Sequence, residues 1–366
     1  MKKFQQILTL ALSLGFLAVF SAWFLIAPDA EESTVERRRL AKRPALSFSS
    51  VTNGSFMNGF EKYMLDQFPL RNGFRGLKAA VSAKVFMKKD NNGLYSVGEH
   101  LSKLDFPTDS ESVDHAARRF RYVYDTYLRN AGTKTYLSVI PDKNTFIASQ
   151  NGYPDKDYKA LTERLRSGFP DATYIDISGL LSADDFYYTD SHWRQERITK
   201  VADEIAAQMG AERIGTCEIQ DTGRPFYGVY YGQAALPHAP ERLFYLDNAV
   251  IRGLQVYNVE TQSDIPVYDL GAAAGRDPYE MFLGGARSII RITNPNAAQE
   301  RRLIIFRDSF GSSIAPLLAA GYSEITLVDI RYISPLSLGK LIDFTKADDV
   351  LFLYSASVIN NSETIK

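Results

Sequence analysis

The chain opens with a long apolar stretch that follows a short N-terminal segment containing two lysines. Residues 7–27 carry no charge and are mostly apolar. As a helix with a rise of about 1.5 Å per residue, this segment would cross roughly 30 Å of hydrocarbon. Secretory signal peptides have a shorter apolar core of about 7–15 residues. The pattern therefore predicts an uncleaved signal anchor over residues 1–27, with a cleaved signal peptide as the alternative.

Residues 28–55 show neither helical nor strand periodicity. They carry charges and then Pro44, followed by a mixture of Ser, Thr, Asn and Gly, which indicates a tether. From Phe56 onward, apolar residues recur at helical spacing and predict two short helices separated by Pro69. One domain is expected to occupy residues 56–366.

The last hundred residues alternate short apolar runs with helical segments. The runs 303–306, 325–328 and 350–354 are expected to be buried strands, with helices near 313–320 and 336–344 between them. Such alternation indicates a parallel sheet with right-handed crossovers. Earlier in the chain, the same signals predict strands at 135–140 and 172–177 and helices at 110–131 and 158–169. The expected fold class is therefore α/β, a parallel sheet flanked by helices.

The middle of the chain has a different character. Residues 225–270 are dense in Tyr, Phe, Val and Gly and lack helix signals. This composition predicts an antiparallel, β-rich segment that is inserted in the α/β core or flanks it.

Charge and cysteine content exclude several kinds of function. Lys and Arg number 42 against 43 Asp and Glu, so a net charge of −1 gives no global basic field for nucleic acid. The one cysteine, Cys217, cannot form an intrachain disulfide, and only four histidines are available as metal ligands. We therefore expect no nucleic-acid partner, no metal and no cofactor, and a buried or idle thiol at Cys217.

The orientation of the apolar stretch is not decided by charge. Two lysines precede it, and five basic residues follow it within 20 residues: Arg37, Arg38, Arg39, Lys42 and Arg43. Because basic residues near a membrane span favour the cytoplasmic side, the two ends compete.

A candidate nucleophile follows the strand expected at 303–306. Catalytic and binding sites in open α/β sheets form beyond the carboxyl ends of the strands. Ser309 lies on the turn between this strand and the next helix. The N–H groups at the start of that helix can stabilise an oxyanion. Asp-Ser before a helix is also an ordinary N-cap, so Ser309 has a structural interpretation as well.

A candidate base, His192, lies two residues after Asp190. A nucleophilic serine needs such a base, and the base needs a partner that holds one ring nitrogen as the donor. Asp-x-His alone occurs often by chance, but here it directly precedes Trp193, the only tryptophan outside the apolar stretch. Asp190, His192 and Ser309 together form a candidate catalytic triad.

The residues around His192 resemble a known family. Residues 188–193, Tyr-Thr-Asp-Ser-His-Trp, are similar to the signature of the DHHW protein family, with Ser191 in place of its first histidine. Residues 307–310 and 328–332 resemble that family's C-terminal motifs. The related alginate O-acetyltransferases of the AlgJ/AlgX kind carry a similar Asp-x-His-Trp and a late serine. Further similarity at 60–71, 141–143 and 281–285 extends the resemblance over most of the chain beyond residue 56.

The resemblance implies an SGNH-hydrolase-like domain that is anchored in the membrane and faces outward. It assigns the roles of nucleophile, base and orienting acid to Ser309, His192 and Asp190, respectively. The chain departs from the SGNH pattern in two ways, because Arg307 stands where a glycine is usual and no Gly-x-Asn-Asp block is evident. The expected oxyanion donors are therefore the Ser309 N–H, helped by Gly284 or Gly285.

Substrate contacts are expected near the triad from Arg331, Tyr188 and Trp193. Arg331 follows the next strand and either holds an anionic sugar group or forms a structural ion pair. Tyr188 and its neighbour Tyr187 either stack on a sugar ring or pack in the core. Residues 142–143, Asp-Lys, are expected to be a turn with a surface ion pair.

Together with the candidate triad, the resemblance implies an extracytoplasmic enzyme that transfers acetyl groups to or from hydroxyls of a cell-surface polysaccharide. An esterase would use water as the acceptor instead. The alternative from a different class is a catalytically degenerate SGNH-like protein that binds glycans or assists their assembly, and a purely structural domain is a third. The resemblance also implies a membrane-bound O-acyltransferase as the acetyl donor.

Overall fold

The computed structural model describes residues 2–366 and divides into two compact units. The first unit comprises the chain up to Asn92 together with Tyr231–Pro237. The second comprises Gly93–Tyr230 and His238–Lys366. The boundary that the sequence suggested at residue 56 thus lies inside the first unit.

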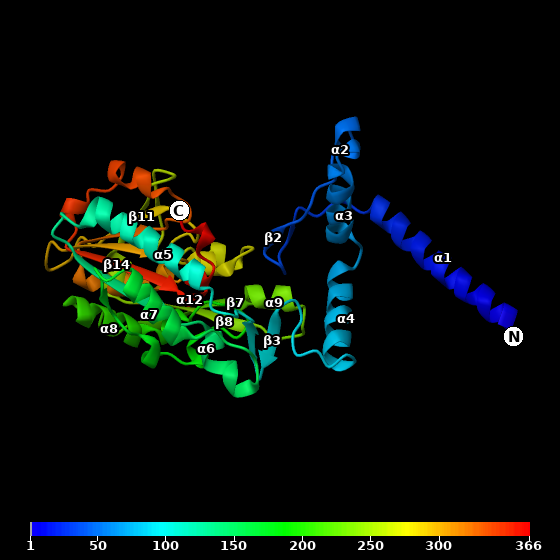
Figure 1. The fold of residues 1–366 in the computed structure, drawn as a ribbon, viewed down its shortest axis with the longest axis horizontal. Coiled ribbons are helices and arrows are strands. Elements are labelled where there is room, and N and C mark those ends of the chain that lie inside the picture. The colour runs from blue at the N-terminus through cyan, green and yellow to red at the C-terminus, as the bar shows by residue number, and fades with distance from the viewer. Residues whose placement is uncertain (1) are drawn as a thin grey trace. The chain divides into compact units, whose positions relative to one another are not determined.

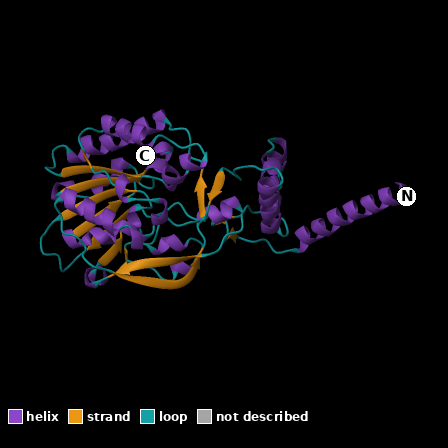
Figure 2. Ribbon diagram, turned by 90° about the horizontal axis from the view of Figure 1, so that it is seen from below, coloured by secondary structure: helices purple, strands orange, loops and turns teal. Residues whose placement is uncertain are grey.

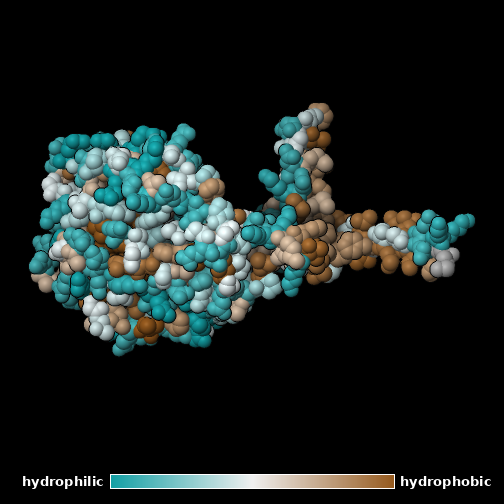
Figure 3. All heavy atoms as spheres, turned by 60° about the horizontal axis from the view of Figure 1, so that its bottom comes forward, coloured by the Kyte–Doolittle hydropathy of each residue, from teal (hydrophilic) through white to brown (hydrophobic). Residues whose placement is uncertain are grey.

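The first unit begins with the helix α1, Lys2–Ile26. Within residues 2–366, α1 is the one helix long and apolar enough to cross a membrane. None of its side chains is buried, and its apolar surface is visible as a brown rod in Figure 3. The apolar N-terminal helix expected from the sequence is therefore confirmed.

The remainder of the first unit is a short hairpin followed by helices (Figure 1). The hairpin pairs β1, Glu32–Ser33, with β2, Arg38–Arg39. The helices are α2, Phe48–Thr52, α3, Ser55–Gln67, and α4, Arg71–Lys84. Two helices separated near Pro69 were expected from residue 56, and α3 and α4 agree with that expectation. The tether also contains the short β1, β2 and α2, which are too brief to show a periodic pattern.

The second unit contains a central eight-stranded sheet between layers of helices (Figure 2). Its strand order is β10-β9-β11-β13-β12-β14-β5-β6. The strands are β5 (Lys134–Ile140), β6 (Thr173–Tyr174), β9 (Gln255–Asn258), β10 (Ser263–Ile265), β11 (Ile289–Thr293), β12 (Arg302–Arg307), β13 (Glu324–Val328) and β14 (Asp349–Ser355). The five strands from β13 to β6 in that order are parallel, which confirms the α/β class.

The sheet is nevertheless mixed, because β11, β9 and β10 join it in antiparallel pairs beyond β13. The sequence pattern did not predict β11, whose residues alternate between apolar and polar only at Arg291 and Thr293. Residues 225–270 also differ from the expected single β-rich segment. The hairpin of β7, Glu218–Phe226, and β8, Glu241–Asp247, stands apart from the central sheet, whereas β9 and β10 extend it.

Short helices occur in places where no helix was expected from the sequence. They are α9, Val229–Ala234, and α10, Ala249–Gly253. Conversely, the helix expected at 336–344 is reduced to a 3₁₀ segment, Pro335–Lys340. Helices this short are set by local caps and packing rather than by a repeated apolar face.

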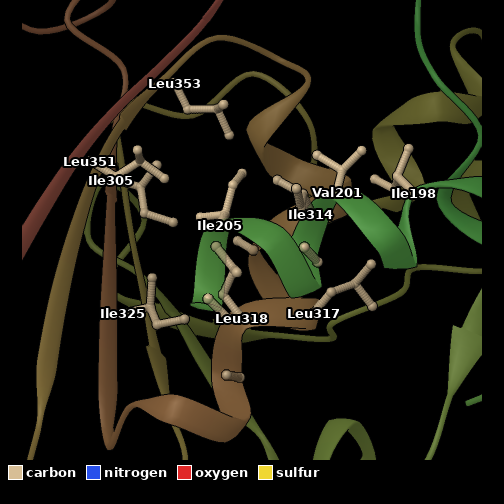
Figure 4. Close-up of a cluster of buried hydrophobic side chains, with 14 of the residues drawn as sticks. Ile198, Val201, Ile205, Ile305, Ile314, Leu317, Leu318, Ile325, Leu351 and Leu353 are labelled. Carbon is tan, nitrogen blue, oxygen red and sulfur yellow. The ribbon is translucent and has the colours of Figure 1, made fainter. Parts of the chain in front are cut away.

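Two apolar cores cover the two faces of the sheet. One core contains the helices α5, Ser110–Val123, and α7, Tyr158–Gly168, with α12, Ala356–Asn360. The other contains α8, Thr199–Met209, and α11, Gly311–Ile314, which continues as a 3₁₀ segment to Gly321. In Figure 4, Ile205 of α8 faces Ile305 and Leu351 of the sheet, and Val201 lies beside Ile314 of α11. This core fixes α11, and therefore the turn that precedes it, against the strand ends.

Two further elements belong to the second unit. The hairpin of β3, Leu94–Val97, with β4, His100–Lys103, follows Asn91-Asn92-Gly93 in the chain. The short helix α6, Lys143–Ile147, begins after the carboxyl end of β5.

Candidate active site

Ser309 lies at the carboxyl end of β12, on the turn that leads into α11. The neighbouring Asp308 is fully buried and fixes this turn. Its Oδ1 accepts a hydrogen bond from the Phe310 N–H (3.1 Å), and its Oδ2 accepts one from the Ser355 N–H at the end of β14 (2.8 Å). Both carboxylate oxygens of Asp308 are occupied by backbone donors, and Asp308 therefore holds the turn that carries Ser309 in place. The side chain of Ser309 itself is partly exposed.

His192 lies on a loop that precedes α8 and meets Ser309 across 117 residues of sequence. Its Nε2 is 2.7 Å from Ser309 Oγ, and its Nδ1 is 2.7 Å from Asp190 Oδ1. Asp190 is fully buried, and its Oδ2 also accepts a hydrogen bond from the Val229 N–H (2.8 Å). The structure thus brings together all three residues of the candidate triad.

This arrangement determines the roles that each group can play. An ionised carboxylate only accepts hydrogen bonds, so His192 Nδ1 carries a proton and donates a hydrogen bond to Asp190 Oδ1. His192 Nε2 is then left as the acceptor for the Ser309 hydroxyl. A serine hydroxyl in this position can transfer its proton to the imidazole as Oγ attacks a carbonyl carbon.

The His192 ring is supported by an aromatic stack that the sequence did not reveal. Tyr279 stacks on it with ring centroids 3.8 Å apart and an interplanar angle of 14°. The Tyr279 hydroxyl donates to Ser313 Oγ (2.8 Å), which also accepts the Trp193 Nε1–H (2.8 Å). Ser313 Oγ in turn donates to the Phe310 carbonyl (3.2 Å). Ser313 therefore connects Tyr279, which stacks on His192, with Trp193 and with the turn that carries Ser309.

Trp193 does not form the expected substrate contact. It is fully buried, and its N–H is bound to Ser313. The ring packs edge-on against Phe310 at 5.3 Å. Trp193 therefore supports the triad from the core side and offers no surface to a ligand.

The loop that carries the base is held by two buried charged groups. Lys143 Nζ donates to the carbonyls of Tyr187 (2.7 Å), Tyr188 (3.0 Å) and Asp190 (3.0 Å). The Glu241 carboxylate accepts the N–H groups of Tyr188 (2.6 Å) and residue 189 (2.7 Å) from the same loop. Lys143 thus holds the carbonyls of this short segment, and Glu241 holds its N–H groups. Both residues are distant from the segment in sequence.

Lys143 is 2 % exposed, so the surface ion pair expected at residues 142–143 is wrong. Burial lowers the pKa of Lys143 to about 7, although the Glu241 and Asp190 carboxylates favour its charged form. The only signal in the sequence was the strand that ends three residues before Lys143, because the residues that follow a buried strand lie at the edge of the sheet where sites form.

The candidate oxyanion donors are not equivalent. Within residues 2–366, no acceptor is found for the Ser309 N–H, which leaves this donor available. The Gly285 N–H already donates to the Phe282 carbonyl (3.2 Å), so Gly285 is not available as expected. Gly284 lies in the same turn and has a positive φ of 69°. The turn contacts Arg307, whose Nη2 donates a hydrogen bond to the Gly285 carbonyl (3.4 Å).

The basic residues at this edge are held in an ion-pair cluster. Arg331 Nε and Nη2 donate to the two oxygens of Asp329 (2.9 and 2.7 Å). The fully buried Arg307 lies 3.9 Å from the same carboxylate. The structural ion pair considered for Arg331 is therefore present, and its side chain remains 17 % exposed.

The two neighbouring tyrosines have separate environments. Tyr187 is fully buried and packs on Phe226 with ring centroids 4.6 Å apart. Tyr188 is half-buried, with the Arg194 guanidinium over its ring at 4.6 Å and His100 edge-on at 4.8 Å. Only Tyr188 retains a surface for a ligand.

Other reactive groups of the second unit do not form a site. Burial raises the pKa of Cys217, and its Sγ accepts a hydrogen bond from Asn248 (3.3 Å), so this thiol is not activated as a nucleophile. Within residues 2–366, no group of three or more His, Cys, Asp or Glu side chains has the arrangement of a metal site.

Comparisons with known proteins show the fold. No family model and no curated protein matches the chain. Its structure is similar to that of a DHHW family protein from Eubacterium siraeum, with a TM-score of 0.60 and 19% identity over 75% of this chain and 95% of that one. A structure of Bacillus cereus PatB1 with a sulfonyl adduct gives a TM-score of 0.59 and 17% identity over 73% and 95% of the two chains. The similarity to a DHHW family protein agrees with the resemblance seen in the sequence.

A third comparison is more distant. The O-acetyltransferase domain of Pseudomonas putida AlgJ gives a TM-score of 0.46 and 14% identity over 73% of this chain and 92% of that one.

Proposed function

We propose that this protein is a serine-dependent enzyme that transfers acetyl groups to or from hydroxyls of an extracytoplasmic polysaccharide. The observation that carries the proposal is the hydrogen-bonded chain from Asp190 through His192 to Ser309, with 2.7 Å at both contacts of the imidazole. The three hydrogen-bonded residues lie at the carboxyl ends of the strands, where α/β folds place their catalytic groups.

In the first half of the reaction, Ser309 Oγ attacks the carbonyl carbon of an acetyl ester and its proton passes to His192 Nε2. Asp190 stabilises the imidazolium, and the Ser309 N–H donates to the oxyanion. The bond between the carbonyl carbon and the departing alcohol then breaks. The alcohol leaves with the proton from His192, and Ser309 carries the acetyl group.

In the second half, a sugar hydroxyl gives its proton to His192 and attacks the acetyl carbon. The bond to Ser309 Oγ breaks, and Oγ recovers its proton from His192. Water in place of the sugar would make the protein an esterase. The acyl enzyme is common to both outcomes, so the same triad serves either.

The comparisons support this proposal at the level of the fold. A sulfonyl adduct, as in the PatB1 structure, is a covalent product of a nucleophile, and PatB1 shares its fold with this chain. The polysaccharide acceptor, and a membrane-bound O-acyltransferase as donor, rest on the resemblance of residues 188–193 and 307–310 to the DHHW and AlgJ/AlgX motifs. An extracytoplasmic location rests on that resemblance and on α1.

Labelling with a sulfonyl fluoride tests the nucleophile directly. The Ser309 Oγ–S bond forms as fluoride leaves, so the intact mass should rise by one sulfonyl group, and peptide mapping should place it at Ser309. Ser309→Ala should lose the label, and its hydrolysis of p-nitrophenyl acetate should fall by about 10³-fold or more. The matched control is Ser312→Ala in the following helix α11, because its buried hydroxyl has no hydrogen-bond partner among the described residues, and labelling of this variant should persist. Equal labelling of the two variants would contradict the proposal.

The alternative is a glycan-binding protein without turnover. The observation that favours it is Arg307, which fills the position before Asp308-Ser309 with a buried guanidinium instead of a glycine. This alternative requires polysaccharide binding that survives Ser309→Ala and His192→Ala, together with no labelling of the unmodified protein.

A further inference from the structure

The helices α3 and α4 of the first unit direct polar residues toward the preceding hairpin. The contacts are Tyr63 Oη to Asp29 (2.8 Å), Arg38 Nη1 to Asp66 (2.8 Å), the Ala30 N–H to Gln67 (2.9 Å), and the ion pairs of Glu36 with Arg71 and Arg75. The polar side of this helix pair is therefore satisfied within the chain. These contacts include Arg38, which is one residue of the basic cluster that follows α1.

Another side of the two helices is apolar and largely exposed. On α4 and its N-cap, Leu70, Phe74, Leu77, Val81 and Val85 follow one another at helical spacing. Leu77 is 60% exposed and Val85 67%. The exposed apolar residues continue on α3 and beyond α4, as Met57, Met64, Leu65, Phe86 and Met87. A helix in a soluble domain shows the reverse pattern, with its apolar face buried, so this surface requires an occupant.

The helix α1 contacts this surface near its own C-terminal end. Phe20 of α1 packs against Phe68 and Phe74, with ring centroids 5.5 and 5.7 Å away. Phe24 packs edge-on against Tyr63 at 5.3 Å. The apolar surfaces of α1 and of the helix pair are continuous in the space-filling view (Figure 3).

The position of Phe20 in α1 indicates how deep in a bilayer this contact would lie. It lies six residues before the end of α1, which corresponds to about 9 Å along a helix. If α1 spans a bilayer, the junction of α3 and α4 lies at the boundary between headgroups and acyl chains. Interfacial helices bury their apolar face to about 5–10 Å at that boundary, so the two depths agree.

The charge of α4 suits the same location. Besides Arg71 and Arg75, which pair with Glu36, the helix contains Lys78 and Lys84 and no acidic residue. Lys84 and the following Lys88 and Lys89 are exposed. Basic side chains beside an apolar face are attracted to anionic headgroups.

We infer that α3 and α4 form a second membrane contact, with their apolar face lying in the interface of the bilayer that α1 is expected to enter. The occupant of the uncovered face is lipid. This contact does not depend on the proposed acyl transfer, and it would hold the first unit against the membrane along two helices instead of a single tether.

The test uses the full-length chain in lipid nanodiscs of phosphatidylcholine and phosphatidylglycerol. The single cysteine makes the labelling selective: in a Cys217→Ser background, Leu77→Cys carries an environment-sensitive NBD dye on the apolar face. The matched control is Asn72→Cys, because Asn72 is exposed on the same helix about 140° away around its axis. Emission is recorded with and without lipids that carry a quencher in their acyl chains.

The inference predicts blue-shifted emission at position 77 and quenching by the labelled lipids at least several-fold stronger than at position 72. Equal, water-like emission at both positions would overturn it. Blue-shifted emission at 77 without lipid quenching would also overturn it, because a second copy or another protein would then cover the face.

Discussion

The stack of Tyr279 on His192 gives the base a partner whose effect can be measured at the level of single residues. Tyr279→Phe keeps the ring and removes only the hydrogen bond to Ser313, which still accepts from Trp193. Tyr279→Leu removes the ring face on which the imidazolium rests. Because such contacts contribute about 0.5–1.5 kcal/mol, kcat should be about 3- to 10-fold lower in the Leu variant than in the Phe variant. Steady-state hydrolysis of p-nitrophenyl acetate checks this, and equal kcat values would show that the stack is passive.

Lys143 links pH to the stability of the loop that carries the base. Its pKa in the folded state is about 7, whereas an ordinary lysine titrates near 10.5, so the unfolded chain binds more protons between these values. The free energy of unfolding contributed by Lys143 is therefore present above pH 10.5 and is lost as the pH falls through 7.

This linkage predicts that the difference in free energy of unfolding between the wild type and Lys143→Met rises from pH 7 to pH 10. Urea unfolding at several pH values measures it, and the comparison with the variant removes the titration of all other groups. A difference independent of pH would contradict the lowered pKa of Lys143. Below pH 7, where Lys143 carries three N–H donors, Lys143→Met should also lower activity, because the carbonyls of the loop lose this donor.

At the level of elements, the loop before α8 depends on its close approach to the segment that begins α9. A Cβ on Gly228 would fall on the backbone of Thr189 and displace the neighbouring Val229 N–H from Asp190. Gly228→Ala should therefore cost about 1–3 kcal/mol of stability and lower activity. The matched control is Gly179→Ala, since nothing lies within 4 Å of a Cβ there. Thermal unfolding and esterase assays of the two variants check this, and similar behaviour of both would contradict it.

The turn before α11 shows why one element alone does not make the site. Asp308 connects it to the end of β14, and Ser313 on α11 connects it to Trp193 and Tyr279. Each of these partners comes from a different part of the chain. The geometry of Ser309 is thus a property of several elements packed at one edge of the sheet.

At the level of the whole molecule, the fate of α1 is the main open prediction. If α1 is an anchor, protein extracted from its native membrane keeps residues 1–27, and its intact mass equals that of the full chain. It should also stay in the membrane after washing at alkaline pH, because about 20 apolar residues insert in an effectively irreversible way. A smaller intact mass, equal to that of a chain that begins after residue 27, would support the cleaved signal peptide instead.

The sequence by itself determined the local features whose signals are contiguous. The run of apolar residues defines α1, the helical spacing after Phe56 defines α3 and α4, and the buried runs define β12, β13 and β14. Asp190 and His192 were also visible as candidates, because two residues of one turn carry complementary chemistry. Ser309 was visible because it follows a strand that the pattern predicts.

Only the tertiary structure decided how these features meet. The contact between His192 and Ser309 spans 117 residues, and no local pattern encodes such a distance. Glu241, Tyr279 and Ser313 have no distinguishing neighbours in the sequence, and Lys143 was assigned to the surface because its burial depends on carbonyls 44 to 47 residues away. Local propensity reflects the nearest residues, whereas the burial and pairing of charged groups depend on which distant segments the fold packs together. The sequence therefore supplied the candidates, and the packing of strand ends and loops placed them within reach of one another.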